Sequence, residues 1–106
     1  MGKRRVSRPP GQGPRTLHVE IVVDELDLHG FTADAAERRL ESFLDTHVVR
    51  SPGQVVRIIT GRGTRSAGAP VLLDVVREGL TGWLAHRVDE WVVDVGGGAY
   101  LVRVAA

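Results

Sequence analysis

The chain has 106 residues, no cysteine and a net charge of +1. This length suffices for one domain with a modest core, and the lack of cysteine excludes disulfides, thiolate metal sites and a cysteine nucleophile. Apolar runs of only a few residues exclude a membrane span, and the N-terminus lacks the apolar core of a signal peptide. We therefore expect a single soluble cytoplasmic domain, monomeric and without a membrane partner.

The charge is unevenly divided along the chain. Residues 1–15 contain five basic residues and no acid, whereas the remainder contains nine arginines and all thirteen acidic residues. Prolines and glycines in the basic segment disfavour regular structure. We predict a disordered basic arm over residues 1–16 and a folded domain over 17–106. The arm either binds polyanions or serves only solubility.

The first residues of the segment 17–23 alternate between apolar and polar side chains, which fits an edge strand or an extended lead-in. Residues 25–28 predict a strand. Thr32 is a good N-cap for a helix, and an apolar stripe carries that helix to about Val49. The stripe consists of Ala36, Leu40, Phe43, Leu44 and His47.

The β-branched run at 55–59 predicts a buried strand, and a loop rich in glycine and arginine follows it. Pro70 fits the first position of a second helix. The apolar face of that helix contains Leu72, Leu73, Val76, Leu80, Trp83 and Leu84. Gly79 and Gly82 weaken this helix and indicate close packing or fraying.

Residues 90–95 predict a third strand, 96–98 a turn and 99–104 a fourth strand. The order predicts an α/β fold of the two-layer sandwich type, βαβαββ, with a four-stranded mixed sheet and two helices. Right-handed crossovers make the first three strands parallel or nearly so, and the last two form a hairpin. The carboxyl ends of the parallel strands then meet at one sheet edge, where ligands bind in open α/β sheets.

Two polar residues, Asp27 and His29, end the first strand. With a period of two, both project to one face, and Gly30 then permits a sharp turn. An imidazole exchanges a proton near neutral pH, so His29 could activate a water or a ribose 2′-hydroxyl while Asp27 orients it. Alternatively, Asp27 holds a hydrated Mg²⁺ or Mn²⁺ ion. An isolated Asp and His on a strand face are more often structural, so their position at the sheet edge decides the interpretation.

The loop after the second strand is the strongest candidate for binding phosphate. Gly61 and Gly63 allow backbone N–H groups to face an anion, while Arg62, Arg65 and Ser66 supply donors. Arg62 could also stabilise charge on non-bridging phosphate oxygens. The spacing is not that of a P-loop. The structural alternative is a glycine-rich turn that only connects strand to helix.

The remaining histidines and most aromatic residues have ordinary explanations. His18, His47 and His86 show no metal-ligand spacing and are assigned to surface or packing roles. The aromatic residues are too few for a base-stacking platform and are expected to lie mostly in the core. Phe31 is the exception, because it follows His29 and Gly30 directly.

Together these motifs resemble the Smr (small MutS-related) domain over about residues 24–104. The likeness lies in Leu26-Asp27-Leu28-His29-Gly30, Ile58-Ile59-Thr60-Gly61-Arg62-Gly63 with Ser66, Gly68 and Pro70, Trp83-Leu84, and Gly96-Gly97-Gly98-Ala99. The chain resembles stand-alone members, because it has no ATPase or mismatch-recognition region.

The resemblance implies a fold like the C-terminal domain of a bacterial translation initiation factor, nucleic-acid binding, and nicking of DNA or cleavage of RNA. Asp27 and His29 match the motif associated with cleavage. Many members have a histidine where this chain has Thr60, which puts a two-histidine mechanism in doubt. The expected substrate-binding residues are Gly30, Thr60, Gly61, Arg62, Gly63, Arg65, Ser66 and Gly97.

Three functions compete. The first is an endonuclease acting on DNA or RNA. The second is a non-catalytic module that docks on RNA, ribosomes or branched DNA. The third, an enzyme for a small phosphorylated metabolite, would differ by a shallow salt dependence of binding, because a polyanion releases many counterions.

Overall fold

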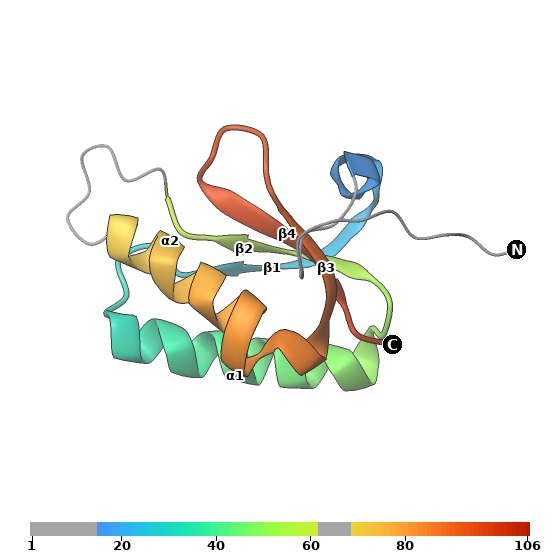
Figure 1. The fold of residues 1–106 in the computed structure, drawn as a ribbon, viewed down its shortest axis with the longest axis horizontal. Helices are drawn as coiled ribbons and strands as arrows, with labels where there is room; N and C mark the ends of the chain where they lie inside the picture. Colours follow the sequence, from blue (N-terminus) through green and yellow to red (C-terminus); the bar gives the residue numbers. More distant parts are fainter. Residues whose placement is uncertain (1–14, 62–68) are drawn as a thin grey trace, which may run out of the picture.

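The computed structural model describes residues 15–61 and 69–106, so the predicted basic arm falls almost entirely outside the described residues. One four-stranded sheet has two α-helices on one of its faces (Figure 1). The elements are β1 (Val22–Asp27), α1 (Ala33–Arg50), β2 (Val55–Ile59), α2 (Ala69–Glu78), β3 (Val88–Val93) and β4 (Ala99–Val104). No helix in the described ranges is long and apolar enough to cross a membrane.

The strands lie in the order β1-β2-β4-β3. β1 and β2 are parallel, and β4 is antiparallel to both of its neighbours. The predicted mixed sheet is therefore confirmed, and β3 runs in the same direction as β1 and β2. β4 lies between β3 and β2 and pairs with both, and the short turn makes β3 and β4 antiparallel neighbours.

The register aligns the strand ends at one edge of the sheet. Asp27 at the end of β1 pairs with Ile59 at the end of β2, and Ile59 pairs with Ala99 at the start of β4. The turn between β3 and β4 therefore lies beside the segment that follows β2. This confirms the predicted convergence for the described parts of the three segments.

The main core lies between the sheet and the helices. The predicted stripe of α1 is confirmed, with four buried residues, Ala36, Leu40, Leu44 and His47. Thr32 caps the helix by accepting a hydrogen bond from the Ala35 N–H at 3.2 Å. Local periodicity and capping therefore position α1 against the sheet.

The segment before β1 differs from the prediction. Residues Arg15–Val19 form a 3-10 turn, η1, and the strand begins only at Val22. The turn lets Leu17 bury itself completely against Val55 and Leu101, on the sheet face opposite the helices (Figure 1). The first part of the segment predicted as an edge strand or an extended lead-in is therefore a 3-10 turn that buries one leucine.

The second helix also differs from the prediction. It ends at Glu78, a π-helical turn follows at Gly79–Trp83, and a 3-10 turn at Ala85–Arg87 leads into β3. Trp83, the last residue of the π-turn, is 44% exposed rather than in the core, whereas Leu84 is fully buried as predicted. β3 spans 88–93 rather than 90–95, whereas β4 spans the predicted residues.

Close packing explains one of the two glycines in this region. A Cβ atom at Gly79 would lie 3.1 Å from Cδ2 of Leu40 on α1. A Cβ atom at Gly82 would meet nothing within 4 Å. Gly79 therefore permits the close approach of the two helical segments, and the structure gives no packing reason for Gly82.

Candidate functional site

The Asp27–His29 pair forms where β1 ends. Leu28 is fully buried, and its N–H donates to the Ile59 carbonyl at 2.8 Å, which anchors the segment to β2. Gly30 then adopts a φ of 84°, which favours glycine. His29 lies in this turn rather than in the strand, so the predicted period-two arrangement is replaced by a turn that brings the two side chains into contact.

One carboxylate oxygen of Asp27 binds His29 twice. Oδ1 accepts the backbone N–H of His29 at 3.0 Å and lies 2.9 Å from ring atom Nδ1. The side-chain hydrogen bond, followed by the backbone one, lowers the pKa of Asp27, so this carboxylate is ionised at neutral pH. Because an ionised carboxylate only accepts hydrogen bonds, Nδ1 carries the proton and the neutral ring keeps its lone pair on Nε2. The His29 side chain is 73% exposed, so Nε2 is accessible to a ligand.

The end of β2 is tied to the turn between β3 and β4. The N–H groups of Thr60 and Gly61 both donate to the Gly98 carbonyl, at 2.9 and 3.0 Å. The Thr60 hydroxyl lies 3.3 Å from the same oxygen and 3.1 Å from the Gly61 carbonyl. These bonds hold the base of the predicted phosphate-binding loop in place.

This arrangement refines one expectation and corrects another. Thr60 is completely buried and its hydroxyl bonds within the protein, so we assign it a role in positioning the loop, while its contact with substrate stays a prediction. The Gly61 N–H already donates to a carbonyl, so it does not face an anion as predicted. Backbone donors at a strand end pair with a neighbouring carbonyl when one is in reach, because an unpaired buried N–H is costly.

The other predicted binding residues divide into two groups. Gly30 and Gly97 have positive φ and would have open space around a Cβ atom, so both serve as turn residues next to the site. Their contact with substrate stays a prediction. Arg62, Gly63, Arg65 and Ser66 lie outside the described residues, and their roles also stay predictions.

Comparison with protein families identifies the family to which this fold belongs. The profile of the Smr domain matches residues 26–104. The chain belongs to the Smr domain family. The matched range contains both the Asp27–His29 pair and the segment that begins at Thr60.

A solved structure agrees with this assignment. The crystal structure of the Smr domain of Thermus thermophilus MutS2 is similar to this Smr domain, with a TM-score of 0.65 and 25% identity. The similarity covers 79% of this chain and all of the other. A comparison with curated proteins gave no match.

One cation beside the site of this Smr domain was missed by sequence reasoning. Cζ of Arg39 lies 5.0 Å from the centre of the Phe31 ring. Phe31 follows the Asp27–His29 segment, so the cation–π contact places an exposed guanidinium next to the candidate site. The spacing of Arg39 from the apolar stripe places it on the exposed side of the helix. This spacing does not by itself predict the contact with Phe31.

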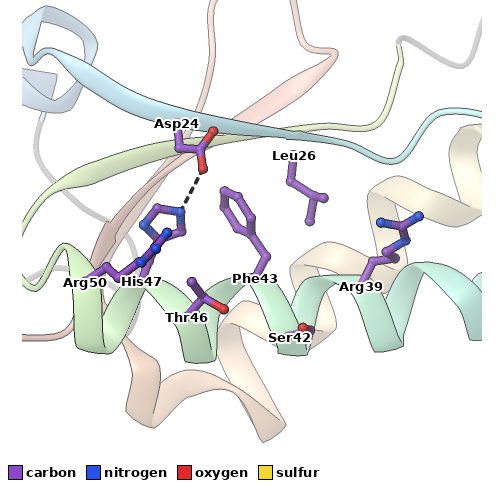
Figure 2. Close-up of a pocket in the computed structure, with 8 residues that line it drawn as sticks. All are labelled: Asp24, Leu26, Arg39, Ser42, Phe43, Thr46, His47 and Arg50. Atoms are coloured by element: carbon purple, nitrogen blue, oxygen red, sulfur yellow. Dashed lines mark hydrogen bonds and ion pairs between the residues drawn. The ribbon is translucent and has the colours of Figure 1, made fainter.

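His47 has the packing role that was predicted for it. Its Nε2 lies 2.9 Å from Oδ2 of Asp24 and its Nδ1 lies 3.0 Å from Oγ of Ser51, so the ring joins α1 to β1 (Figure 2). The pKa of Asp24 is lowered first by the hydrogen bond from the Glu25 N–H and then by the one from His47. Both ring nitrogens of His47 are engaged, so His47 is not a candidate for the general base.

The donor set for a metal ion is small in this part of the molecule. Within residues 15–61 and 69–106, no three His, Asp or Glu side chains gather in a way that could hold a metal. Both hydrogen bonds from His29 use Oδ1 of Asp27, so Oδ2 offers one carboxylate ligand. This fits a hydrated Mg²⁺ or Mn²⁺ ion that takes its other ligands from water and a phosphate, but not a site formed by protein alone.

Proposed function

We propose that this Smr domain is an endonuclease that cleaves phosphodiester bonds in DNA or RNA. The pairing of Asp27 with His29 carries this proposal, because it leaves Nε2 of an oriented, exposed imidazole at the ligand-binding edge of the sheet. Membership of the Smr family supports a nucleic acid as the ligand. Asp27 and His29 are the proposed catalytic residues.

In the proposed reaction, Nε2 of His29 removes a proton from the attacking hydroxyl, either of water or of a ribose 2′-OH. The oxygen forms a bond to phosphorus, the bond from phosphorus to the leaving oxygen breaks, and the leaving oxygen takes up a proton from water. The imidazolium then releases its proton to water, which restores the base. The Asp27 carboxylate stabilises the imidazolium that forms, because its Oδ1 is 2.9 Å from Nδ1. A general base of this kind contributes about 10²- to 10⁴-fold to a rate.

Binding of the substrate is assigned to the neighbouring segments. We propose that Arg62 and Arg65, with Ser66, bind phosphate oxygens, and that Gly30 and Gly97 leave room for the strand. A bound Mg²⁺ or Mn²⁺ would supply Lewis-acid polarisation of the phosphate, with Asp27 as its protein ligand. Asp27 would then orient His29 through Oδ1 and hold the ion through Oδ2.

The second candidate is a nucleic-acid-binding module without catalysis. The position of Thr60 favours it, because the side chain at that position is buried and bonded within the protein rather than exposed as an imidazole. Such a module would dock on RNA, ribosomes or branched DNA by the same edge.

A cleavage assay separates the two. Purified protein is incubated with nicked, branched and single-stranded DNA and with RNA, each with Mg²⁺, Mn²⁺ or EDTA. His29→Ala is compared with His86→Ala, since His86 is also exposed but lies before β3, in the turn Ala85–Arg87. We expect His29→Ala to lower the cleavage rate by at least about 10²-fold and His86→Ala to leave it unchanged. Binding without any cleavage above the His29→Ala background would establish the non-catalytic module instead.

A further inference from the structure

We propose that the groove between the free edge of β1 and helix α1 binds the sugar–phosphate backbone of a nucleic-acid strand beyond the cleavage site. This assignment rests on the proposed function and extends it to a surface on the side of the domain. The groove is a second contact region for the substrate. Its residues come mainly from α1 and not from the predicted phosphate-binding loop.

The groove exists because β1 is an edge strand and α1 crosses beneath it. Its volume is about 240 Å³ (Figure 2). Asp24 and Leu26 of β1 form one wall, and the other wall is a single flank of α1. The residues from α1 are Arg39, Ser42, Phe43, Thr46, His47 and Arg50.

Two arginines define the ends of the groove. Arg39 and Arg50 lie at opposite ends of the row in Figure 2, and their 11-residue separation corresponds to about 16 Å along a helix. Ser42 and Thr46 lie between them, and both residues are exposed. Among the residues that the structure describes, neither guanidinium forms an ion pair, so both can bind phosphates. Arg50 lies close enough to Asp24 for its charge to lower the pKa of that carboxyl, and Arg39 contacts the Phe31 ring.

The acidic residues of α1 lie away from this flank. At 100° per residue, positions 39, 46 and 50 fall within about 40° of one another around the helix, whereas the acids fall on its other sides. Those acids are Asp34, Glu37, Glu41 and Asp45. The groove flank of α1 is therefore basic, although the helix as a whole contains as many acids as arginine and histidine residues.

Asp24 is the single acid in the groove lining, and its side chain is half exposed but hydrogen-bonded through both oxygens. Oδ1 accepts the Glu25 N–H at 2.8 Å, and Oδ2 lies 2.9 Å from Nε2 of His47. Figure 2 shows one oxygen of this carboxylate directed at the His47 ring, with Arg39 at the other end of the row. Because both oxygens are engaged, Asp24 opposes an anionic strand less than a free carboxylate would.

A physical link joins the groove to the candidate site. Arg39 lies over the Phe31 ring, and Phe31 is two residues beyond His29. A strand cleaved at His29 can therefore continue past Arg39 and along α1 to Arg50. Spaced arginines and hydroxyls without base-reading groups are typical of backbone contacts that position a substrate without specifying its sequence.

The test measures binding of a fluorescein-labelled 20-nucleotide single strand by anisotropy at several salt concentrations. Arg39→Gln, Arg50→Gln and the double variant are compared with Arg77→Gln, which removes the same charge from an exposed position on α2. Glutamine retains helix propensity, and far-UV circular dichroism checks the fold. As a second readout, the amide signals of Ser42 and Thr46 are followed by NMR while the strand is added.

Each groove variant should lower the magnitude of the slope of log affinity against log salt by about 0.7, and the double variant by about 1.4. Arg77→Gln should leave the slope unchanged, and the Ser42 and Thr46 signals should shift on binding. If wild-type protein binds no nucleic acid, both the groove assignment and the proposed function are wrong. If it binds but the groove variants match Arg77→Gln, only the groove assignment is wrong.

A competition experiment distinguishes nucleic acid from an acidic peptide. Unlabelled strand and poly-glutamate are compared at equal charge as competitors for the labelled strand. We expect the nucleic acid to compete far better. If poly-glutamate competed as well as the nucleic acid on wild-type protein, and this competition were lost in the double variant, the groove would be an acidic-peptide site. That result would overturn the assignment.

Discussion

A single carboxylate oxygen of Asp27 accepts both the backbone N–H and the ring Nδ1–H of His29, at 3.0 and 2.9 Å. The backbone bond holds the turn, and the ring bond selects the tautomer whose free lone pair lies on Nε2. The two bonds thus couple the local conformation of the chain to the chemistry proposed for the imidazole.

Asp27→Asn tests this coupling. The amide removes the ionised acceptor, so the ring is no longer held in one tautomer and the imidazolium loses its counter-charge. We expect the single-turnover cleavage rate to fall by at least about 10²-fold, since the same change in a serine protease triad costs about 10⁴-fold. Affinity for uncleaved substrate, measured without metal, should change little. A wild-type cleavage rate in this variant would rule out the positioning role of Asp27.

Thr60→Val tests the assignment of Thr60 as a positioning residue. Valine preserves the shape and removes a hydroxyl that bonds to the Gly61 and Gly98 carbonyls. The Gly98 carbonyl keeps two backbone donors, so we expect a loss of only about 1 kcal/mol in the free energy of unfolding. Urea unfolding measures this loss, and Thr46→Val at an exposed position should stay within about 0.5 kcal/mol of wild type. A large loss of nucleic-acid affinity without loss of stability would instead return Thr60 to the ligand-binding set.

Gly79→Ala and Gly82→Ala should have opposite effects on stability. The new methyl group at Gly79 would crowd Leu40 and also lie 3.4 Å from Leu84, both of which are fully buried. We expect Gly79→Ala to destabilise the domain by about 1 kcal/mol through overpacking. Gly82→Ala meets no neighbour and should stabilise by about 0.5 kcal/mol, because alanine loses less entropy on folding. The midpoint of thermal unfolding measures both effects. If the midpoint shifted in the same direction in both variants, the packing explanation would be refuted.

Arg57→Gln tests how the hairpin is held against the parallel strands. On the sheet face opposite the helices, Arg57 forms ion pairs with Glu25 on β1 and with Asp94, the latter at 2.9 Å. These partners, Glu25 first, raise the pKa of Arg57, so its charge persists at every accessible pH. Because the Arg57 side chain is 30% exposed, solvent screening limits the expected loss of stability to about 1 kcal/mol. The rate of amide hydrogen exchange should increase mainly in the turn after β3. An equal increase across the whole sheet would contradict this local role.

Acid should weaken the domain through three carboxylates. The pKa of Glu20 is lowered first by its hydrogen bond to Arg103, and those of Asp24 and Asp27 are lowered by the bonds described above. The pKa of each carboxyl is lower in the folded than in the unfolded state. Its contribution to the free energy of unfolding is therefore fully present above the unfolded pKa, near 4, and is lost as the pH falls through the folded pKa. With respect to these groups, the urea midpoint should stay constant between pH 7 and 5 and decrease below about pH 4.

Asp24→Asn provides the control for this pH dependence. The amide cannot titrate, so the decrease below pH 4 should be shallower than in wild type, with a lower midpoint at pH 7. An unchanged acid limb would show that Asp24 does not contribute to it.

The amino-acid sequence by itself determined the features that depend on neighbours along the chain. The spacing of Leu40 and Leu44 predicts the buried face of α1, and the β-branched run predicts β2, because helix and strand periods are local properties. The Asp27–His29 pair was also predictable, since its members are two residues apart. Convergence of the strand ends followed from the general geometry of βαβ units.

The tertiary structure decided everything that depends on partners distant in the chain. The Gly98 carbonyl accepts hydrogen bonds from the N–H groups of Thr60 and Gly61, which lie 38 and 37 residues away in the chain. These bonds fix the backbone at the start of the loop. Insertion of β4 beside β2 creates that contact, and the free edge of β1 that remains creates the groove with Arg39. Local patterns set which residues form each element, but hydrogen-bond partners and exposed edges arise only when the elements pack together.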